Sequence, residues 1–395
     1  MKKYILLSIF LMAAIPGFSQ KTERTFIFGH SLINHAEQVN PTPSQETSIP
    51  HWFQFLSDAG GHNYAVAGQY GFLPQHANLP PSPQWGFDVV EGAWDADFEE
   101  FSDADFTSIL LTPANFIQYQ GSDINYEGMD ISPVEATNTI FNWCNAQEPE
   151  MNYYIYENWP DMASFLGNSF PPTNSEWINY NDYLNGEFHN WFIDYHDFVT
   201  DANENICVKM IPVGPIISQI LNQAPFNEIP ITDLYEDDAP HGRPTIYFLG
   251  AMITYMAMYE EMTPADFEVD DIIHPIVRDN YESLTNIIWK ALLDFDYEDG
   301  QSRVFCSEPI SNSIEETKTV SEIEILPNPA RDFLTIESKD FFETVELINI
   351  SSGQKLILKT NTKSINIRSL KSGVYIMKLL NHEGRYLKSK RFVKI

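Results

Sequence analysis

Two short segments of the chain carry side chains that together could perform nucleophilic catalysis. The first, Gly29-His30-Ser31-Leu32, directly follows an apolar, β-rich run. A serine there can project from the edge of a sheet, and the preceding glycine lets the chain turn tightly. The second, Asp238-Ala239-Pro240-His241, precedes an expected helix. This spacing lets one loop hold a carboxylate beside an imidazole. We therefore predict that Asp238 orients His241, which takes the proton of Ser31.

Other side chains offer competing chemistry. A serine after a strand often only caps a helix, so Ser31 gains its weight from the second segment. Asp271-Ile272-Ile273-His274 repeats the Asp-x-x-His spacing after an acidic stretch. A metal enzyme is a further alternative, although the histidines near the N-terminal strands show neither HExxH nor paired ligand spacing. They are His30, His35, His51, His62 and His76.

The elements that would position these side chains follow from the hydrophobic pattern of residues 21–300. We expect strands over 25–28, 64–67, 106–112, 152–157 and 207–212, and helices over 50–59, 133–144, 187–202, 245–261 and 280–294. Strands that alternate with helices indicate an α/β fold whose parallel sheet is covered on both faces. Such sheets place their sites at the carboxyl ends of the strands.

An early Ser31 and a late Asp-x-x-His resemble the SGNH/GDSL hydrolase family over about residues 25–262. The resemblance implies a flavodoxin-like three-layer fold and ester hydrolysis by a Ser-His-Asp triad. The nucleophile block is GHSL, so His30 replaces the family's usual aspartate. The last block, DAPH, matches in full, and HGRPTIYFLGAMITY resembles the family's closing block. The resemblance therefore favours Asp238 and His241 over the second Asp-x-x-His.

The two middle blocks of the same family supply the oxyanion donors. In AVAGQYG, Gly68 best matches the family's oxyanion glycine, and Gly71 is the alternative. Where the family shows Gly-x-Asn-Asp, this chain has Pro113-Ala114-Asn115-Phe116. The resemblance therefore assigns Asn115 as a side-chain donor, without the neighbouring glycine and aspartate.

The two ends of the chain carry export signals. Residues 1–20 have a charged start, an apolar run and small residues before a cut, as a secretory signal peptide does. After the 21–300 domain and a polar linker over 301–322, residues 323–395 show six short alternating segments typical of a small β-sandwich. LPNPARDFLTI, VELINISSGQKL, INIRSLKSGVYIMKL and KRFVKI resemble the type IX secretion sorting domain of Bacteroidota. A carbohydrate-binding sandwich is the alternative.

Composition limits the partners. The chain has 395 residues and a net charge of −32. Residues 321–395 hold 13 Lys and Arg against 8 Asp and Glu, a net of +5, which leaves −37 for residues 1–320. So acidic a body disfavours nucleic acid and anionic membranes. The three cysteines, Cys144, Cys207 and Cys306, allow one disulfide but no disulfide framework. No later stretch is apolar enough for a membrane span.

The sequence thus predicts an exported serine esterase that needs no cofactor or metal. The favoured substrate is an O-acetyl ester on an extracellular polysaccharide, and the type IX machinery is the expected export partner. A lipid esterase is less favoured because no apolar lid-like segment is present. A surface glycan-binding protein that lost the chemistry is the other alternative. Several aromatic residues near strand ends could stack on sugars, although core positions are expected for most: Trp85, Trp94, Tyr154, Tyr156 and Trp159.

Overall fold

The computed structural model describes residues 20–35, 48–82, 85–87, 89–113, 120–297 and 300–306, and in the C-terminal part 324–328, 330–337, 342, 344–349, 355–359, 362–380 and 386–394. The chain divides into two compact units, Met1–Pro309 and Ile310–Ile395. None of the helices in these described residues is long and apolar enough to cross a bilayer.

The first unit is built on a six-stranded parallel sheet. Its strands are β1 (Thr22–Gly29), β2 (Asn63–Tyr70), β3 (Glu91–Gly92), β4 (Ser108–Leu111), β5 (Asn152–Tyr156) and β6 (Val208–Ile211). Their order across the sheet is β3-β2-β1-β4-β5-β6. Without the two-residue edge strand β3, this is the flavodoxin-like order, so the predicted fold class is confirmed.

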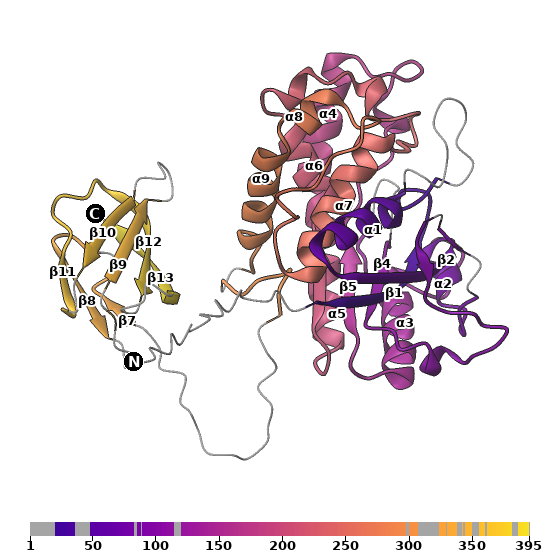
Figure 1. Cartoon of the computed structure of the whole chain (residues 1–395), viewed down its shortest axis with the longest axis horizontal. Coiled ribbons are helices and arrows are strands. Elements are labelled where there is room, and N and C mark those ends of the chain that lie inside the picture. Colours follow the sequence, from indigo (N-terminus) through magenta and orange to yellow (C-terminus); the bar gives the residue numbers. More distant parts are fainter. Residues whose placement is uncertain are drawn as a thin grey trace, which may run out of the picture. The chain divides into compact units, whose positions relative to one another are not determined.

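Helices cover both faces of this sheet (Figure 1). They are α1 (Ile49–Gly60), α2 (Leu73–His76), α3 (Pro133–Gln147), α4 (Asn174–Tyr183), α5 (His189–Ala202), α6 (Val213–Leu221), α7 (Pro244–Tyr259), α8 (Pro275–Asp279) and α9 (Tyr281–Leu293). Helices α1, α6, α7 and α9 share one apolar core with the sheet, and α3 and α5 share the other. The ten predicted elements of this unit all form, with boundaries shifted by a few residues.

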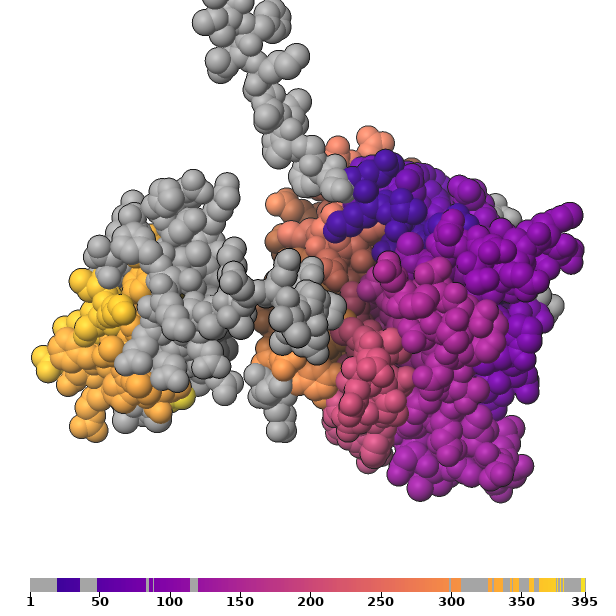
Figure 2. Space-filling model, turned by 90° about the horizontal axis from the view of Figure 1, so that it is seen from below, coloured from indigo at the N-terminus to yellow at the C-terminus, as the bar shows by residue number. Residues whose placement is uncertain are grey.

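Side-chain alternation along the strands creates the two cores. In β1, Ile27 faces the α1 and α7 side, while Phe26 and Phe28 face α3. Each such side chain contributes about 1.5–3 kcal/mol when fully buried. Helix α7 is buried along its whole length, which explains its nearly continuous apolar sequence. In the space-filling view, the N-terminal elements (indigo to purple) and the later helices (magenta to pink) of this unit form one continuous surface (Figure 2).

A disulfide closes the end of the first unit. Cys207, beside β6, is bonded to Cys306, and the N–H of Met210 donates to the carbonyl of Arg303. Residues just past 300, where the sequence analysis ended the first domain, therefore still belong to its structure. Cys144 is a free, buried thiol.

The second unit forms two antiparallel sheets around one small core. One sheet has the order β10-β9-β12-β13 and the other β11-β8-β7. The strands are β7 (Glu324–Leu326), β8 (Phe333–Glu337), β9 (Thr344–Asn349), β10 (Lys355–Lys359), β11 (Ser364–Asn366), β12 (Gly373–Leu380) and β13 (Tyr386–Lys394). The six predicted strands all form, and β7 is an addition that the sequence analysis missed.

Candidate active site

Ser31 lies two residues beyond the carboxyl end of β1, in a turn. Gly29 is needed there for space rather than for turning, because its φ is not in the left-handed region. A Cβ at Gly29 would lie 3.0 Å from Thr112 Oγ1 and 3.1 Å from the Trp85 ring. A side chain at this position would therefore require Thr112 and Trp85 to shift.

His30 shapes the turn that presents Ser31. Its side chain is only 1% exposed, and its Nδ1 accepts the N–H of Leu32 at 3.3 Å. Burial lowers the pKa of His30 to about 3, with smaller contributions from the charges of His76 and His241. His30 is therefore a neutral acceptor at ordinary pH, and its hydrogen bond from Leu32 helps to hold this turn.

His241 and Asp237 complete a chain of hydrogen bonds with Ser31. His241 Nε2 lies 2.9 Å from Ser31 Oγ, and His241 Nδ1 lies 2.7 Å from Asp237 Oδ2. Both distances are within hydrogen-bond range, and the order serine, imidazole, carboxylate suits proton transfer from the hydroxyl. The imidazole side chain is 15% exposed and that of Asp237 is 41% exposed. The site is therefore open enough to admit a substrate.

The carboxylate beside His241 belongs to Asp237, so the assignment of Asp238 to this place is corrected. Tyr235 and Gly242 form an antiparallel bridge, and the N–H of Glu236 donates to the carbonyl of His241. The narrow loop between them turns the Asp237 side chain toward His241. Asp237 Oδ1 also accepts the N–H groups of Ala239 and His241, each at 3.1 Å.

Asp238 instead contributes its backbone, because its carbonyl accepts the N–H of Met162 at 2.8 Å. Burial by itself raises the pKa of Asp237. The hydrogen bonds and charge of His241 outweigh burial, so the net pKa of Asp237 is lowered. Asp237 is thus a carboxylate at neutral pH, as the partner of an imidazole must be.

A second imidazole lies flat against His241. The rings of His35 and His241 are stacked, with centroids 3.6 Å apart and planes inclined by 14°. His35 Nδ1 lies 3.5 Å from Glu236 Oε2. Burial lowers the pKa of His35 to about 4. The charge of His241 lowers this pKa further, whereas the charge of Asp237 raises it. From the sequence alone His35 is only one of several possible metal ligands, because no spacing rule indicates a ring stacked from another loop.

Two further hydrogen bonds hold the parts of the site in place. Trp159 Nε1 donates to the carbonyl of Pro240 at 2.8 Å, which fixes the loop before His241. Tyr247 Oη donates to the carbonyl of Ser31 at 3.0 Å, which fixes the turn of the serine. Both rings are fully buried. The nucleophile turn and the histidine loop are therefore held by the same rigid core.

The predicted oxyanion donors fit this geometry less well. Gly68 lies inside β2 and its carbonyl accepts the N–H of Trp85 at 3.1 Å. Because the N–H and C=O of one extended residue point to the same side, the Gly68 N–H points away from β1 and Ser31. Gly71 follows the carboxyl end of β2, at the same edge of the sheet as Ser31, but its N–H donates to the carbonyl of Gly29 at 2.9 Å. Asn115 lies outside the described residues.

The second Asp-x-x-His builds a helix start instead. His274 Nδ1 accepts the N–H of Ile276 at the first turn of α8, and its backbone N–H donates to Thr245 Oγ1. Asp271 pairs with Arg278. The preference for the segment that contains His241 therefore agrees with the geometry.

The aromatic residues considered for sugar stacking are mostly core residues, as expected. Tyr154, Tyr156 and Trp159 are fully buried, and Trp85 is 7% exposed. Within the described ranges, no group of three His, Cys, Asp or Glu side chains is close enough to hold a metal ion.

Comparison with known proteins identifies the second unit. Residues 324–394 match the family described as the secretion system C-terminal sorting domain. The predicted sorting domain is therefore confirmed, and it assigns the chain to type IX secretion, to the medium or the cell surface. No curated protein matches the chain.

Solved structures resemble the chain only distantly. A family 3 carbohydrate esterase of Clostridium thermocellum is 11% identical over 59% of this chain and 94% of its own, with a TM-score of 0.34. A GDSL-like lipase of Parabacteroides merdae is 11% identical over 61% of this chain and 97% of its own, also with a TM-score of 0.34. PorZ of Porphyromonas gingivalis is 21% identical over 18% of this chain, which spans only 11% of PorZ, with a TM-score of 0.16. Likeness this weak carries no argument about activity.

Proposed function

We propose that the first unit is a serine esterase that acts outside the cell through Ser31, His241 and Asp237. The observation that supports this most is the continuous hydrogen-bonded chain from Ser31 Oγ to the Asp237 carboxylate, with steps of 2.9 and 2.7 Å. A serine and a histidine from opposite ends of the domain have no other evident reason to meet in this order.

In the proposed reaction, Ser31 Oγ attacks the ester carbonyl while its proton passes to His241 Nε2. Asp237 stabilises the imidazolium through the Nδ1–H. The tetrahedral intermediate collapses as His241 returns the proton to the leaving alkoxide, which departs as an alcohol. Water then attacks the acyl-enzyme with His241 as the base, releases the acid and restores Ser31.

The oxyanion of the intermediate needs at least one donor close to Ser31. The Ser31 N–H has no acceptor among the described residues and is the first choice. The side chain of Asn115 is the second, as the family resemblance implies. The loss of one such donor typically costs about 10²–10³ in rate.

The substrate part of the proposal is an O-acetyl ester on an extracellular polysaccharide. The sorting domain supports a substrate that the protein meets outside the cell.

Hydrolysis of a short-chain aryl acetate by the full mature chain tests the proposal. Ser31→Ala should abolish turnover, whereas Ser175→Ala, an exposed serine at the start of α4, should leave it unchanged. Equal activity of the wild type and Ser31→Ala would reject the assignment of the nucleophile. Acetate release from acetylated glycans then tests the substrate.

A further inference from the structure

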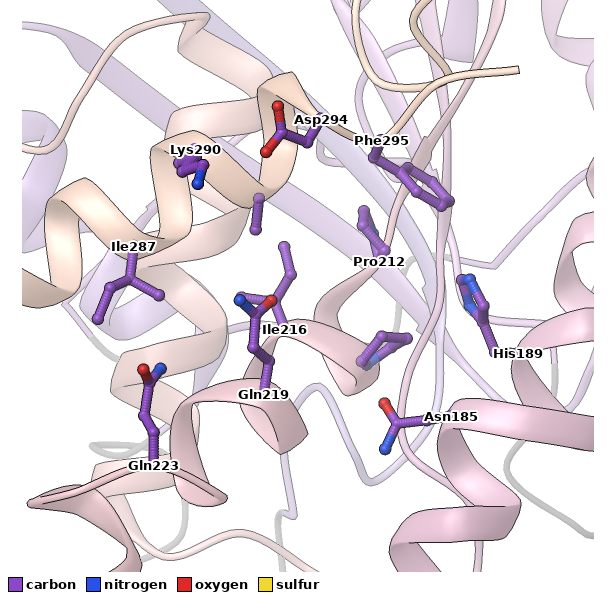
Figure 3. Close-up of a pocket in the computed structure, with 12 residues that line it drawn as sticks. Asn185, His189, Pro212, Ile216, Gln219, Gln223, Ile287, Lys290, Asp294 and Phe295 are labelled. Atoms are coloured by element: carbon purple, nitrogen blue, oxygen red, sulfur yellow. The ribbon is translucent and has the colours of Figure 1, made fainter. Parts of the chain in front are cut away.

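One cavity of the first unit is not lined by Ser31, His241 or Asp237. It has a volume of about 530 Å³, within the range of small-molecule sites. It lies between α6, α9 and the π-helical turn Leu184–Phe188 that leads into α5 (Figure 3). The cavity borders the end of β6, three strands from β1, and strands spaced about 4.8 Å apart put β6 about 14 Å from β1. The esterase chemistry proposed above makes no use of this cavity.

A buried carboxylate supports the imidazole in its wall. Glu157 follows β5 and is completely buried, and its Oε1 lies 2.7 Å from Nδ1 of the cavity-lining His189. Within the described residues, Glu157 Oε2 has no hydrogen-bond partner. Burial raises the pKa of Glu157 to about 7, despite the opposing effect of His189. When Glu157 and His189 share one proton across this hydrogen bond, the pair has no net charge.

The remaining charges of the wall cancel as well. Lys290 in the last turn of α9 and Asp294, which caps the end of that helix, both line the cavity. The lining therefore has no net charge, although residues 1–320 carry −37. A neutral site in so acidic a unit favours an uncharged ligand over a cation or an anion.

Carboxamides supply most of the other polar groups. Asn185, Gln219 and Gln223 lie around the same space (Figure 3). An amide both donates and accepts hydrogen bonds, as a hydroxyl group does. Gln223 Nε2 is buried and has no partner among the described residues, so this donor is unsatisfied beside the cavity. The apolar part of the wall includes Ile216, Ile287 and Phe295.

We propose that this cavity is a non-catalytic binding site for a neutral sugar residue. A sugar ring presents hydroxyl groups at its rim and C–H groups on its faces, which matches a wall of carboxamides, one supported imidazole and aliphatic or aromatic side chains. The ordinary α-helix is interrupted at Leu184–Phe188, and such π-helical turns often occur at functional sites. The site would hold a glycan chain while the esterase centre works elsewhere on the molecule.

The test uses the full mature chain with Ser31→Ala, titrated calorimetrically with unacetylated cellohexaose, xylohexaose and mannohexaose, and with an oligogalacturonate as the anionic probe. At least one neutral probe should bind, and Gln219→Ala combined with Gln223→Ala should weaken its binding at least tenfold. Asn286→Ala, an exposed residue of α9 outside the cavity, is the matched control and should bind as the parent does.

His189→Gln tests the supported imidazole, with the melting temperature confirming that the variant folds. This variant should also weaken binding of the neutral probe. Binding of none of the neutral probes, binding of the anionic probe alone, or equal binding by the cavity variants would overturn the proposal. Aryl acetate turnover by Gln219→Ala/Gln223→Ala with Ser31 intact should stay normal, so the failure of this site and the failure of the esterase assignment can be told apart.

Discussion

Two neighbouring aspartates provide a sharp test of the site, because one touches His241 and the other does not. Asp237→Asn replaces a carboxylate that accepts from His241 Nδ1 and from two backbone N–H groups. If the new amide group faces the imidazole, it donates to Nδ1 and forces the proton onto Nε2, where it blocks proton transfer from Ser31. If the amide rotates, its NH₂ group faces two backbone donors. Neither orientation preserves the network.

The size of the loss follows from the exposure of the carboxylate. Replacement of the aspartate of a buried triad by asparagine costs about 10⁴ in kcat, because the imidazole is held in the wrong tautomer. The Asp237 side chain is 41% exposed, so water competes for the hydrogen bond of the new amide and the expected loss is smaller. We expect a decrease of about 10²–10³ in kcat, which corresponds to about 2.7–4 kcal/mol. Asp238→Asn keeps the backbone carbonyl that binds Met162 and should change kcat by about twofold or less.

The assay is aryl acetate hydrolysis at pH 8 by the wild type and both variants, with thermal melts to show that each variant is folded. A larger loss for Asp238→Asn than for Asp237→Asn, or equal losses, would refute the pairing that the structure gives. A rise in KM for Asp237→Asn without a change in kcat would also contradict this pairing, because the carboxylate acts on the imidazolium rather than on bound substrate.

Two further predictions concern other titratable side chains. His35→Ala should lower kcat about threefold to tenfold with little change in KM, because the stacked ring 3.6 Å away holds the imidazole of His241 in its orientation. His35→Phe, which keeps a flat ring at this position, should retain most of the wild-type kcat. An equal loss in His35→Phe would argue against stacking as the cause. Glu23 is 7% exposed, and burial raises its pKa from 4.5 to about 7, although hydrogen bonds from Thr107 and Ser108 act to lower it. Between these two pH values the folded state therefore keeps a proton on Glu23 that the unfolded state releases. The stabilising contribution of Glu23 is therefore lost as the pH rises through that window. Between pH 5 and 8, the free energy of unfolding of Glu23→Gln should fall by about 2 kcal/mol less than that of the wild type. Denaturant titrations measure this difference, and the same pH dependence in both proteins would contradict the assignment.

Helix α6 shows where local pattern fails as a guide to structure. Val213–Leu221 is short, almost wholly apolar and directly follows a strand and a proline, so its composition does not separate a helix from a continued strand. In the structure the close approach of Gly214 to the Asn158 backbone sets its course, because a Cβ there would lie 2.6 Å from the Asn158 carbonyl oxygen. That contact joins segments distant in the sequence.

The sequence by itself determined the C-terminal sorting domain, the α/β class, the nearly correct bounds of ten elements in the first unit, and Ser31 and His241 as a pair. These depend on hydrophobic period, on turn residues and on motif spacing, which are local properties of the chain. The signal peptide expected over residues 1–20 lies almost wholly outside the described residues and stays a prediction. Only the tertiary structure decided that Asp237 rather than Asp238 faces His241, that His35 stacks on it, and that the Gly68 N–H points away. The reason is physical: spacing limits which side chains can meet, but the direction of each one is set by the strand pairing and packing around it.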